Sequence, residues 1–573
     1  MLIGVSVIFI VLQVWLDLAM PEYMGNITKV VTSGVGTMDE IYYNGKYMIM
    51  CAFGSLAAMI IVSYIASVVG ASYSQKLRSL QFNKVDSFSM AEINKFSTAS
   101  LVTRSTNDVT QVQILVILGL QIIIKAPILA VWAMFKIYGR AYQWTISIGI
   151  AIAVLLILFA VLVILVMPKF RKMQKLIDNV NRVTRENLTG LPVVRAYNAE
   201  SYQEGKFEDA NNELTDTQLY TSRVMAVLWP GINIIMTGSI LAIYWIAAIL
   251  INAATGNIAE QSALFADMVV FTSYSMQILI AFMMISILFV MLPRAQVAAR
   301  RINEIIDTEP SIKDGNANDT DISGRGEIEF RNVSFRYPGA ANNVLENISF
   351  TAKRGETVAF IGSTGSGKST VVNLVPRLYD VTEGSVLIDG TDVRDYKLEA
   401  LHKKIGYVSQ KAVLFSGTVR SNVAFGADAD RTEEGVKEAI RIAQGAEFVE
   451  NMEGGYDAPI VRGGANVSGG QKQRLSIARA ICKRPDIYIF DDSFSALDYR
   501  TDRDLRTALK KAVKDSTSII VAQRIGTIMD ADKIIVLNEG RIVGTGKHKE
   551  LLSTCNVYRE IATSQLSEEE LEI

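Results

Sequence analysis

The sequence contains few of the residues that build most metal and redox sites. Only two of its 573 residues are histidine, His402 and His548, and only three are cysteine, Cys51, Cys482 and Cys555. The cysteines lie far apart and lack the spacing of metal ligands, so we interpret them as reduced, structural thiols. Neither histidine is clustered with possible metal ligands, so no histidine-based metal site is expected.

The sequence also lacks an excess of charge of either sign. Its formal net charge is −1, so nothing indicates nucleic acid as a partner. Half of the residues are hydrophobic, and the excess lies before about residue 293. The rest of the chain has the composition of an ordinary soluble domain. A length of 573 residues predicts two or more domains.

Charged residues are nearly absent from several stretches that are long enough to cross a bilayer, which takes about 20 apolar residues. The first stretch resembles a signal peptide, but it has no basic n-region and no convincing cleavage site, which favours a membrane span. We predict six transmembrane helices, at about residues 1–20, 47–75, 111–135, 141–168, 224–252 and 268–293.

The connections between these spans differ in length and charge. Those after the second and fourth spans, 76–110 and 169–223, are long and highly charged, and we predict helical intracellular arms there. Basic residues lie beside the span ends that face the arms, whereas the loop between the last two spans has none, which indicates cytoplasmic arms. Lys136 and Arg140 oppose this asymmetry because they lie in a predicted outer loop.

Two charged side chains interrupt the predicted spans, Asp17 in the first and Lys125 in the third. A charge that faces lipid is costly, so Lys125 either snorkels, pairs with a carboxylate or lines a cavity, and a substrate role stays open for both residues. The sixth span carries methionines whose flexible thioethers suit either a promiscuous apolar pocket or ordinary helix packing. They are Met276, Met283, Met284 and Met291.

A polar segment separates the apolar part of the chain from the rest. Residues 307–325 contain Pro, Gly, Asn and Asp, and we predict a linker there. It divides a transmembrane domain at 1–306 from a second domain at 326–573. Residues 327–335 alternate like a strand and open the second domain.

A glycine-rich loop lies between a predicted strand at 357–361 and a predicted helix at 371–374. This context identifies a phosphate-binding loop, in which glycines let successive backbone N–H groups face phosphate oxygens. Lys368 can reach the β- and γ-phosphates, and the Ser369 hydroxyl can ligate Mg²⁺. Another predicted strand, 487–490, ends at Asp491, which is placed to hold Mg²⁺ through water.

Further motifs resemble those of ATP-binding-cassette (ABC) exporters. Residues 468–481 (SGGQKQRLSIARAI) resemble the ABC signature and its helix, and residues 495–498 (SALD) resemble the D-loop. Gln410 in YVSQ looks like the Q-loop glutamine, and Tyr337 in FRYPG looks like the aromatic residue that stacks on adenine.

The resemblance covers essentially the whole chain, because residues 101–109 and 186–200 resemble the intracellular arms of such exporters. It implies an all-α six-helix transmembrane domain with long intracellular helical arms, followed by an α/β P-loop ABC ATPase domain. It further implies a multi-pass protein of the cell membrane (plasma or inner membrane), in contact with the lipid bilayer, with a cytoplasmic ATPase domain. The implied cofactors are ATP and Mg²⁺.

The resemblance also assigns roles to individual residues. Two ATPase domains of such exporters meet head to tail, so that each ATP lies between one domain's P-loop and the other domain's signature. The metal ligands implied are Ser369, Gln410 and Asp491. The residues implied to act on a partner's ATP are Ser468, Gly469, Gly470 and Gln471, with Asp498 in the D-loop. Those implied to bind this chain's own ATP are Tyr337, Gly362, Ser363, Thr364, Gly365, Ser366, Gly367, Lys368, Ser369, Thr370, Gln410 and Asp491.

Two positions depart from the family pattern. Asp492 stands where the resemblance implies a catalytic glutamate, and Gln523 stands where it implies a histidine. Aspartate is one methylene shorter, and a misplacement of about 1 Å can cost roughly 100-fold in rate. Glutamine cannot become positive or shuttle a proton as histidine can. The changes indicate either drift in a slower enzyme or a dedicated non-hydrolytic site, which the retained ATP-binding residues favour.

The signature, by contrast, is largely intact, with Val467 in place of the usual leucine. A heterodimer explains both observations, because a second half-transporter with an intact Glu and His would use this chain's signature. The pattern resembles the degenerate subunit of bacterial heterodimeric multidrug ABC exporters, which implies efflux of small amphipathic molecules. The alternatives are a lipid or peptide exporter of the same architecture and a non-transporting regulatory subunit.

Overall fold

The computed structural model describes residues 2–34, 36–138, 142–254, 257–317, 326–427 and 432–567. The chain divides into two compact units. The first comprises Met1–Lys84 and Ala99–Thr308, and the second comprises Val85–Thr98 and Glu309–Ile573. The short segment Val85–Thr98 therefore belongs with the C-terminal unit, although helices of the first unit flank it in the sequence.

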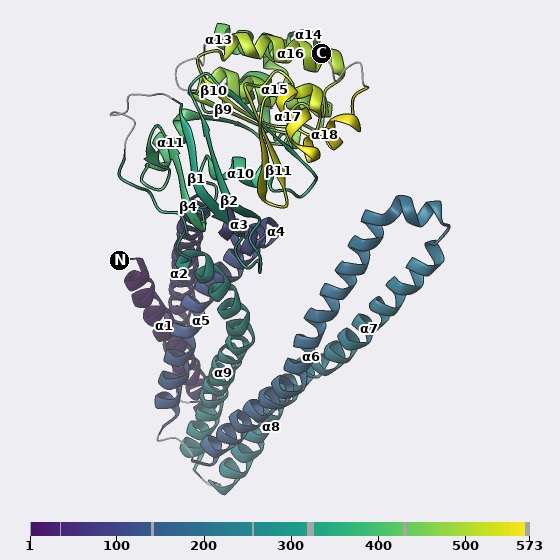
Figure 1. Ribbon diagram of the computed structural model, residues 1–573. Helices are drawn as coiled ribbons and strands as arrows, with labels where there is room; N and C mark the ends of the chain where they lie inside the picture. The colour runs from purple at the N-terminus through teal and green to yellow at the C-terminus, as the bar shows by residue number, and fades with distance from the viewer. Residues whose placement is uncertain are drawn as a thin grey trace. The chain divides into compact units, whose positions relative to one another are not determined.

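The described residues contain six helices that are long and apolar enough to cross a membrane, as predicted. They run over Leu2–Ser33, Met38–Asp86, Thr98–Ile137, Tyr142–Ala196, Glu200–Ala253 and Ile258–Asp307. They comprise α1 (Leu2–Ser33), α2 (Met38–Asp86), α4 (Thr98–Thr103), η1 (Arg104–Asp108), α5 (Val109–Ile137), α6 (Tyr142–Ala196), α7 (Glu200–Ala226), α8 (Leu228–Ala253) and α9 (Ile258–Asp307), all of which except η1 are labelled in Figure 1.

Four of the six helices, with 49 to 55 residues, are more than twice as long as the roughly 20 residues that a bilayer requires. Helix α6 has 55 residues, which gives about 80 Å at the rise of an α-helix. It turns at residues 197–199 into the polar helix α7, and the two helices pack side by side (Figure 1). The charged stretch 169–223 is therefore a helical hairpin that extends out of the apolar part of the first unit.

The two intramembrane charges contact each other. The Lys125 Nζ atom of α5 lies 3.4 Å from Asp17 Oδ2 of α1. The Ser55 hydroxyl of α2 donates to Asp17 Oδ1, and Gln277 Nε2 of α9 donates to the Asp17 carbonyl at 3.2 Å. Of the alternatives for Lys125, pairing with a carboxylate is confirmed. One polar cluster thus ties four helices together within an apolar core, where an unpaired charge would be costly.

The methionines of α9 contribute to packing. Met284 packs against the buried cluster formed by α1, α2, α5, α6, α8 and α9, and Met283 packs against a second apolar cluster. These contacts agree with ordinary helix packing.

The second unit is an α/β domain. A six-stranded sheet has the order β12-β11-β3-β10-β9-β6, and a four-stranded sheet has the order β2-β1-β4-β5. Five strands of the larger sheet, β11 to β6 in that order, are parallel, and β12 pairs antiparallel at its edge. The strands are β1 (Ile328–Phe335), β2 (Leu345–Ala352), β3 (Thr357–Gly362), β4 (Glu383–Ile388), β5 (Thr391–Asp392), β6 (Ile405–Val408), β9 (Ile487–Asp491), β10 (Thr517–Val521), β11 (Lys533–Asn538) and β12 (Arg541–Gly546). A further two-stranded sheet pairs β7 (Gly417–Thr418) with β8 (Pro459–Ile460).

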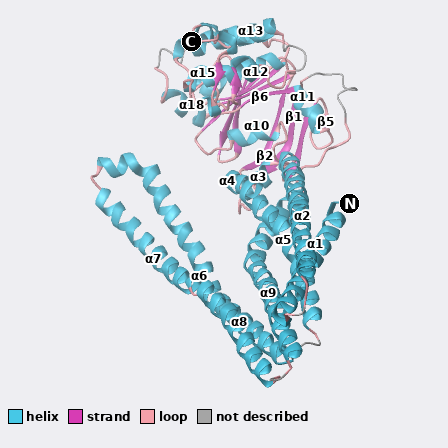
Figure 2. Ribbon diagram, turned by 180° about the vertical axis from the view of Figure 1, so that it is seen from behind, coloured by secondary structure: helices cyan, strands magenta, loops and turns pink. Residues whose placement is uncertain are grey.

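Helices lie on both sides of the parallel sheet (Figure 2), so its strands are enclosed and consist mainly of apolar residues. All five residues of β9 are buried, as expected for a parallel strand enclosed on both faces. The α-helices that follow the first strands of this unit are α10 (Lys368–Leu374), α11 (Leu398–Lys404), α12 (Val419–Val423), α13 (Glu433–Ile442), α14 (Ala446–Glu450), α15 (Gly469–Lys483), α16 (Tyr499–Ala512), α17 (His548–Thr554) and α18 (Asn556–Thr563). Because β3, β10 and β9 are neighbours, the loops at their carboxyl ends meet at one edge, where α/β sheets bind ligands.

Part of the predicted linker is docked on the second unit. The Gly315 N–H donates to the Tyr396 carbonyl at 3.0 Å, and Asp314 Oδ1 accepts from the Leu398 N–H at 2.8 Å. Residues 318–325 of that prediction lie outside the described residues. The short helix α3 (Met90–Phe96) contacts the same unit through Asn94, whose amide donates to the Tyr379 hydroxyl at 3.1 Å.

Candidate functional site

The glycine-rich loop joins β3 to α10 in a conformation that side chains would obstruct. A Cβ atom at Gly362 would lie 2.0 Å from the Leu537 carbonyl oxygen. Gly367 has φ +97°, and a Cβ atom there would lie 2.6 Å from a Leu345 methyl carbon. The close approach of neighbouring strands and the left-handed backbone explain why glycine occupies these positions.

Lys368 is folded over this loop. Its Nζ atom donates to the carbonyl oxygens of Gly362 at 2.9 Å and Ser363 at 2.7 Å. Burial lowers the pKa of the Lys368 ammonium, and the nearby Asp491 and Asp492 oppose that shift. A desolvated cation held by neutral carbonyls gains strongly from an incoming anion such as a phosphate.

Ser369 and Asp491 form the second part of the site. The Ser369 hydroxyl donates to Asp491 Oδ1 at 2.9 Å, and burial raises the pKa of the Asp491 carboxyl. A hydroxyl and a carboxylate are hard oxygen donors that fit Mg²⁺, which is usually bound by one or two carboxylates plus substrate phosphates. In keeping with that mode, the described part of the chain contains no group of three or more His, Cys, Asp and Glu side chains that could hold a metal alone.

Asp492 is held by two glutamine side chains. Its Oδ2 atom accepts from Gln523 Nε2 at 2.7 Å and from Gln410 Nε2 at 3.2 Å. Its backbone has φ +46°, a conformation that is uncommon outside glycine. The Ser495 hydroxyl donates to the Asp492 carbonyl at 3.0 Å. Gln410, predicted as a ligand of Mg²⁺, thus contacts Asp492 rather than the Ser369–Asp491 pair.

Burial raises the pKa of the Asp492 carboxyl, although the donors around it oppose the shift. Between its unfolded pKa, about 3.9, and its raised folded pKa, the folded state binds more protons than the unfolded state. Stability therefore falls as the pH rises through this window and stays lower above it. We expect Asp492→Asn to raise the melting temperature of the ATPase unit in the nucleotide-free chain by about 2 °C at pH 7, for a gain of about 1 kcal/mol in a unit of roughly 250 residues. The gain also includes the loss of the repulsion between the Asp492 and Asp491 carboxylates, since the Asp492 charge raises the pKa of Asp491.

Thermal unfolding at several pH values measures this effect, and the gain should shrink as the pH falls through the raised pKa of Asp492. Asp498→Asn is the matched control, because hydrogen bonds from Thr501 lower the pKa of the exposed Asp498 carboxyl, and no gain is expected there. A gain that is absent, or independent of pH, contradicts the burial argument.

Tyr337 lies beside the helix that follows the loop. Its hydroxyl is 3.1 Å from the Thr370 hydroxyl. Its ring packs edge-on against Phe335, with centroids 4.9 Å apart, and against Tyr379 at 5.2 Å. The aromatic side chain predicted to stack on adenine is therefore anchored next to the loop.

The predicted signature residues begin helix α15. Ser468 is the N-cap: its hydroxyl accepts from the Gln471 N–H at 3.3 Å, and Gln471 Oε1 accepts from the Ser468 N–H at 2.8 Å. Gly469 and Gly470 form the first turn. Asp498 caps α16 in the same way, through the Thr501 N–H at 3.0 Å. These caps satisfy backbone donors that a helix start would otherwise leave unpaired.

Other side chains connect the parts of the site, although the sequence reasoning gave them no role of their own. Gln473 of α15 donates to the Ser409 carbonyl at 3.3 Å and so joins the signature helix to the loop that carries Gln410. Arg506 of α16 donates to the Gly526 carbonyl at 2.8 Å. A glutamine or arginine inside a helix gives no sequence signal of such long-range contacts.

Comparison with known proteins agrees with this geometry. Residues 3–292 match the family described as ABC transporter transmembrane region, and residues 345–495 match the ABC transporter family. The chain is 34% identical over 575 residues to the ABC transporter ATP-binding protein YfiB of Bacillus subtilis (strain 168), covering 99% of this chain and 97% of that protein. It is 33% identical over 497 residues to the ATP-dependent lipid A-core flippase of Pseudomonas aeruginosa, covering 86% and 80%.

A solved structure described as a bacterial Atm1-family ABC exporter with ATP bound has the same fold, with a TM-score of 0.83. The alignment covers 99% of each chain at 24% identity. The chain belongs to the ABC transporter family. It is an exporter half-transporter, a multi-pass membrane protein with a cytoplasmic ATPase domain, and the predicted fold class is confirmed.

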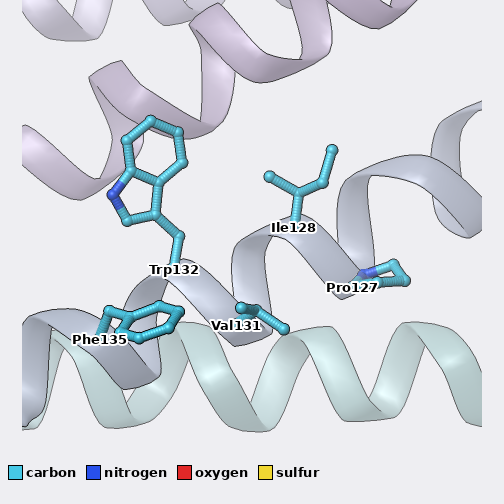
Figure 3. A pocket seen from close by; sticks show the side chains of 5 residues that line it. All are labelled: Pro127, Ile128, Val131, Trp132 and Phe135. Atoms are coloured by element: carbon cyan, nitrogen blue, oxygen red, sulfur yellow. The ribbon is translucent and has the colours of Figure 1, made fainter.

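Helix α5 also bears an apolar crevice in the first unit, with a volume of about 560 Å³. Its lining side chains all come from one stretch of α5, and Figure 3 shows Trp132 and Ile128 pointing to the same side of the helix. The residues are Pro127, Ile128, Val131, Trp132 and Phe135. Such a surface suits an apolar body but contains no polar side chain that would select among ligands.

Proposed function

We propose that this chain is the hydrolysis-impaired half of a heterodimeric ABC exporter. The observation that carries the proposal is the pairing of Asp492 with Gln410 and Gln523 in one site, with the phosphate-binding elements retained. In this account the site binds ATP and Mg²⁺ and hydrolyses ATP weakly.

The chemistry of hydrolysis supports this account. A general base must lie within about 3 Å of the attacking water. The Asp492 carboxylate is one methylene shorter than the glutamate of the family, and one of its oxygens already accepts from both amides. Gln523 can donate a hydrogen bond to a γ-phosphate but cannot take up a proton at neutral pH.

The binding function rests on different side chains. Lys368 would bind the β- and γ-phosphates, Ser369 and Asp491 would hold Mg²⁺, and Tyr337 would stack on adenine. These groups already lie around the glycine-rich loop. Retention of the whole set together with loss of the catalytic pair is what a site that holds ATP would require.

The intact signature supports the need for a partner. In the proposed heterodimer, Ser468 to Gln471 complete the ATP site of a second half-transporter that has a catalytic Glu and His. ATP binding closes the two ATPase domains, and the arms transmit that closure to the spans. Hydrolysis at the partner's site resets the transporter, while ATP at this chain's loop holds the domains in contact.

For the cargo we propose an amphipathic small molecule. A lipid is the second candidate, because relatives named ATP-dependent lipid A-core flippase are 31% to 33% identical to this chain. The apolar crevice of α5 is compatible with the apolar part of either. Transport of a fluorescent lipid and of a cationic dye, measured side by side in proteoliposomes, separates the two.

Substitution of Lys368 tests whether the retained ATP matters. We expect Lys368→Ala to weaken ATP binding at this site by at least 100-fold, because it removes a desolvated cation that faces the phosphates. Transport by the complex should fall with it. Filter binding of radiolabelled ATP gives the first quantity and vesicle uptake the second. Normal transport despite lost ATP binding would refute the role proposed for this site.

A further inference from the structure

The loop that carries Gln523 is fixed from outside the ATP site by a residue near the C-terminus. The Gln565 side chain makes two hydrogen bonds to this loop. Its Oε1 atom accepts from the Ile525 N–H at 2.8 Å, and its Nε2 atom donates to the Gln523 carbonyl at 2.8 Å. One amide thus satisfies a donor and an acceptor two residues apart on the same loop.

The segment that bears Gln565 is itself anchored. Helix α18 buries Tyr558 and Ala562 completely, in the same apolar cluster as Ala522 and Ile525 of the Gln523 loop. Immediately after α18, the Gln565 N–H donates to the Ala562 carbonyl at 3.1 Å. The backbone of Gln565 is therefore held at a defined distance from the loop, although its side chain is exposed.

An exposed glutamine normally keeps its rotamer freedom, and fixing such a side chain costs conformational entropy. Here that cost is offset by two hydrogen bonds to backbone groups. These bonds also restrain the Gln523 side chain, because the backbone carbonyl that Gln565 holds and the side-chain amide that faces Asp492 belong to the same residue. With the carbonyl held by Gln565, the side chain is directed at Asp492, whose Oδ2 lies 2.7 Å from Gln523 Nε2.

We infer that Gln565 is a positioning residue for the ATP site, which aims Gln523 at the place of the γ-phosphate. The C-terminal segment after α18 then acts as a brace of the loop at residues 523–526. The inference rests on the proposed function only in that it takes this site to bind ATP. Gln565 itself lies against the backbone of the loop, so it acts through Gln523.

Hydrogen exchange tests the brace without nucleotide. In the full chain, Gln565→Leu keeps a side chain of similar size and removes both hydrogen bonds, so the peptide containing residues 523–527 should exchange at least about 10-fold faster. Ser564→Ala is the matched control, because the Ser564 hydroxyl bonds within its own segment, to the Ile561 carbonyl at 2.8 Å. Unchanged exchange at 523–527 in Gln565→Leu overturns the brace.

Nucleotide binding tests the positioning role. In the presence of Mg²⁺, Gln565→Leu should lower the affinity for a fluorescent ATP analogue about fivefold, because one hydrogen bond to the γ-phosphate is lost. The affinity for the ADP analogue should stay unchanged. Gln523→Ala should give the same loss, and the double variant should lose no more than either single variant, since both act on one contact. Equal losses for both nucleotides, additive losses, or no loss would reduce Gln565 to a structural residue.

The two failures are distinguishable. The proposed ATP site would fail if the wild-type chain bound neither analogue, or if Lys368→Ala left the affinity for both analogues unchanged. The exchange result for Gln565 would still stand in either case. Gln565→Glu adds a graded variant, because it keeps the acceptor for the Ile525 N–H and loses the donor to the Gln523 carbonyl. Its ATP affinity should lie between those of the wild type and Gln565→Leu.

Discussion

In the proposed complex of this chain with a second half-transporter, Ser468→Ala in this chain should lower the ATPase rate by about 100-fold. Removal of one preorganised donor to a developing charge typically costs about 10²–10³ in turnover. In the proposed arrangement, Ser468 serves the partner's ATP, where the catalytic Glu and His reside. Asp492→Ala in the same complex should change the rate less than twofold, because this chain's own site contributes little turnover.

Ser468 also caps helix α15, so loss of the cap must be separated from loss of the ATP contact. Loss of a cap alone costs about 1 kcal/mol of stability. Ser468→Asp is the control: aspartate caps a helix as well as serine, but its charge repels a phosphate. Both variants should be inactive, and only Ser468→Ala should unfold at lower temperature. An active Ser468→Asp complex would contradict the assigned role.

Replacing Asp492 and Gln523 with the glutamate and histidine of the family pattern should create a second hydrolytic site. With the catalytic glutamate of the partner replaced by glutamine, the complex should retain almost no ATPase activity. In that background, Asp492→Glu combined with Gln523→His should raise the rate by about 100-fold. The longer carboxylate recovers about 1 Å of reach, and a histidine restores proton transfer at neutral pH.

Each single substitution measures its own share. Asp492→Glu alone supplies the base without the proton carrier, and Gln523→His alone supplies the reverse, so each should recover only a small part of the rate. Lys368→Ala added to the double variant is the control and should abolish the gain. If the unmodified Asp492 and Gln523 already supported the full rate in this background, the two substitutions would be drift in a working enzyme.

The fold could be predicted from the sequence because its signals are local. Apolar stretches with at most one charged residue mark the six spans, and the glycine loop follows a short β-rich run. The contacts of Ser369 with Asp491 at 2.9 Å and of Gln523 with Asp492 at 2.7 Å follow from the parallel strands β3, β10 and β9, whose carboxyl ends meet at one edge of the sheet.

Other features could not be predicted, because they depend on residues that are distant in the sequence. Lys125 and Asp17 are 108 positions apart, and no local sequence pattern indicates that they pair. The packing of α1 and α5 brings them together. The left-handed backbone of Asp492, at φ +46°, could not be predicted, because an aspartate in the sequence does not by itself indicate a positive φ. Gln565 lies outside every recognised motif, and its role is visible only where α18 brings it to the Gln523 loop.

The most direct test of the central claim is the ATPase rate of this chain alone and co-purified with the product of its neighbouring gene, at the same protein concentration and saturating ATP. The heterodimer account predicts ATP binding but negligible turnover by the chain alone, and robust turnover only by the complex. Robust turnover by the chain alone, abolished by Asp492→Ala, would show that Asp492 is a working catalytic residue and that the functional unit is a homodimer.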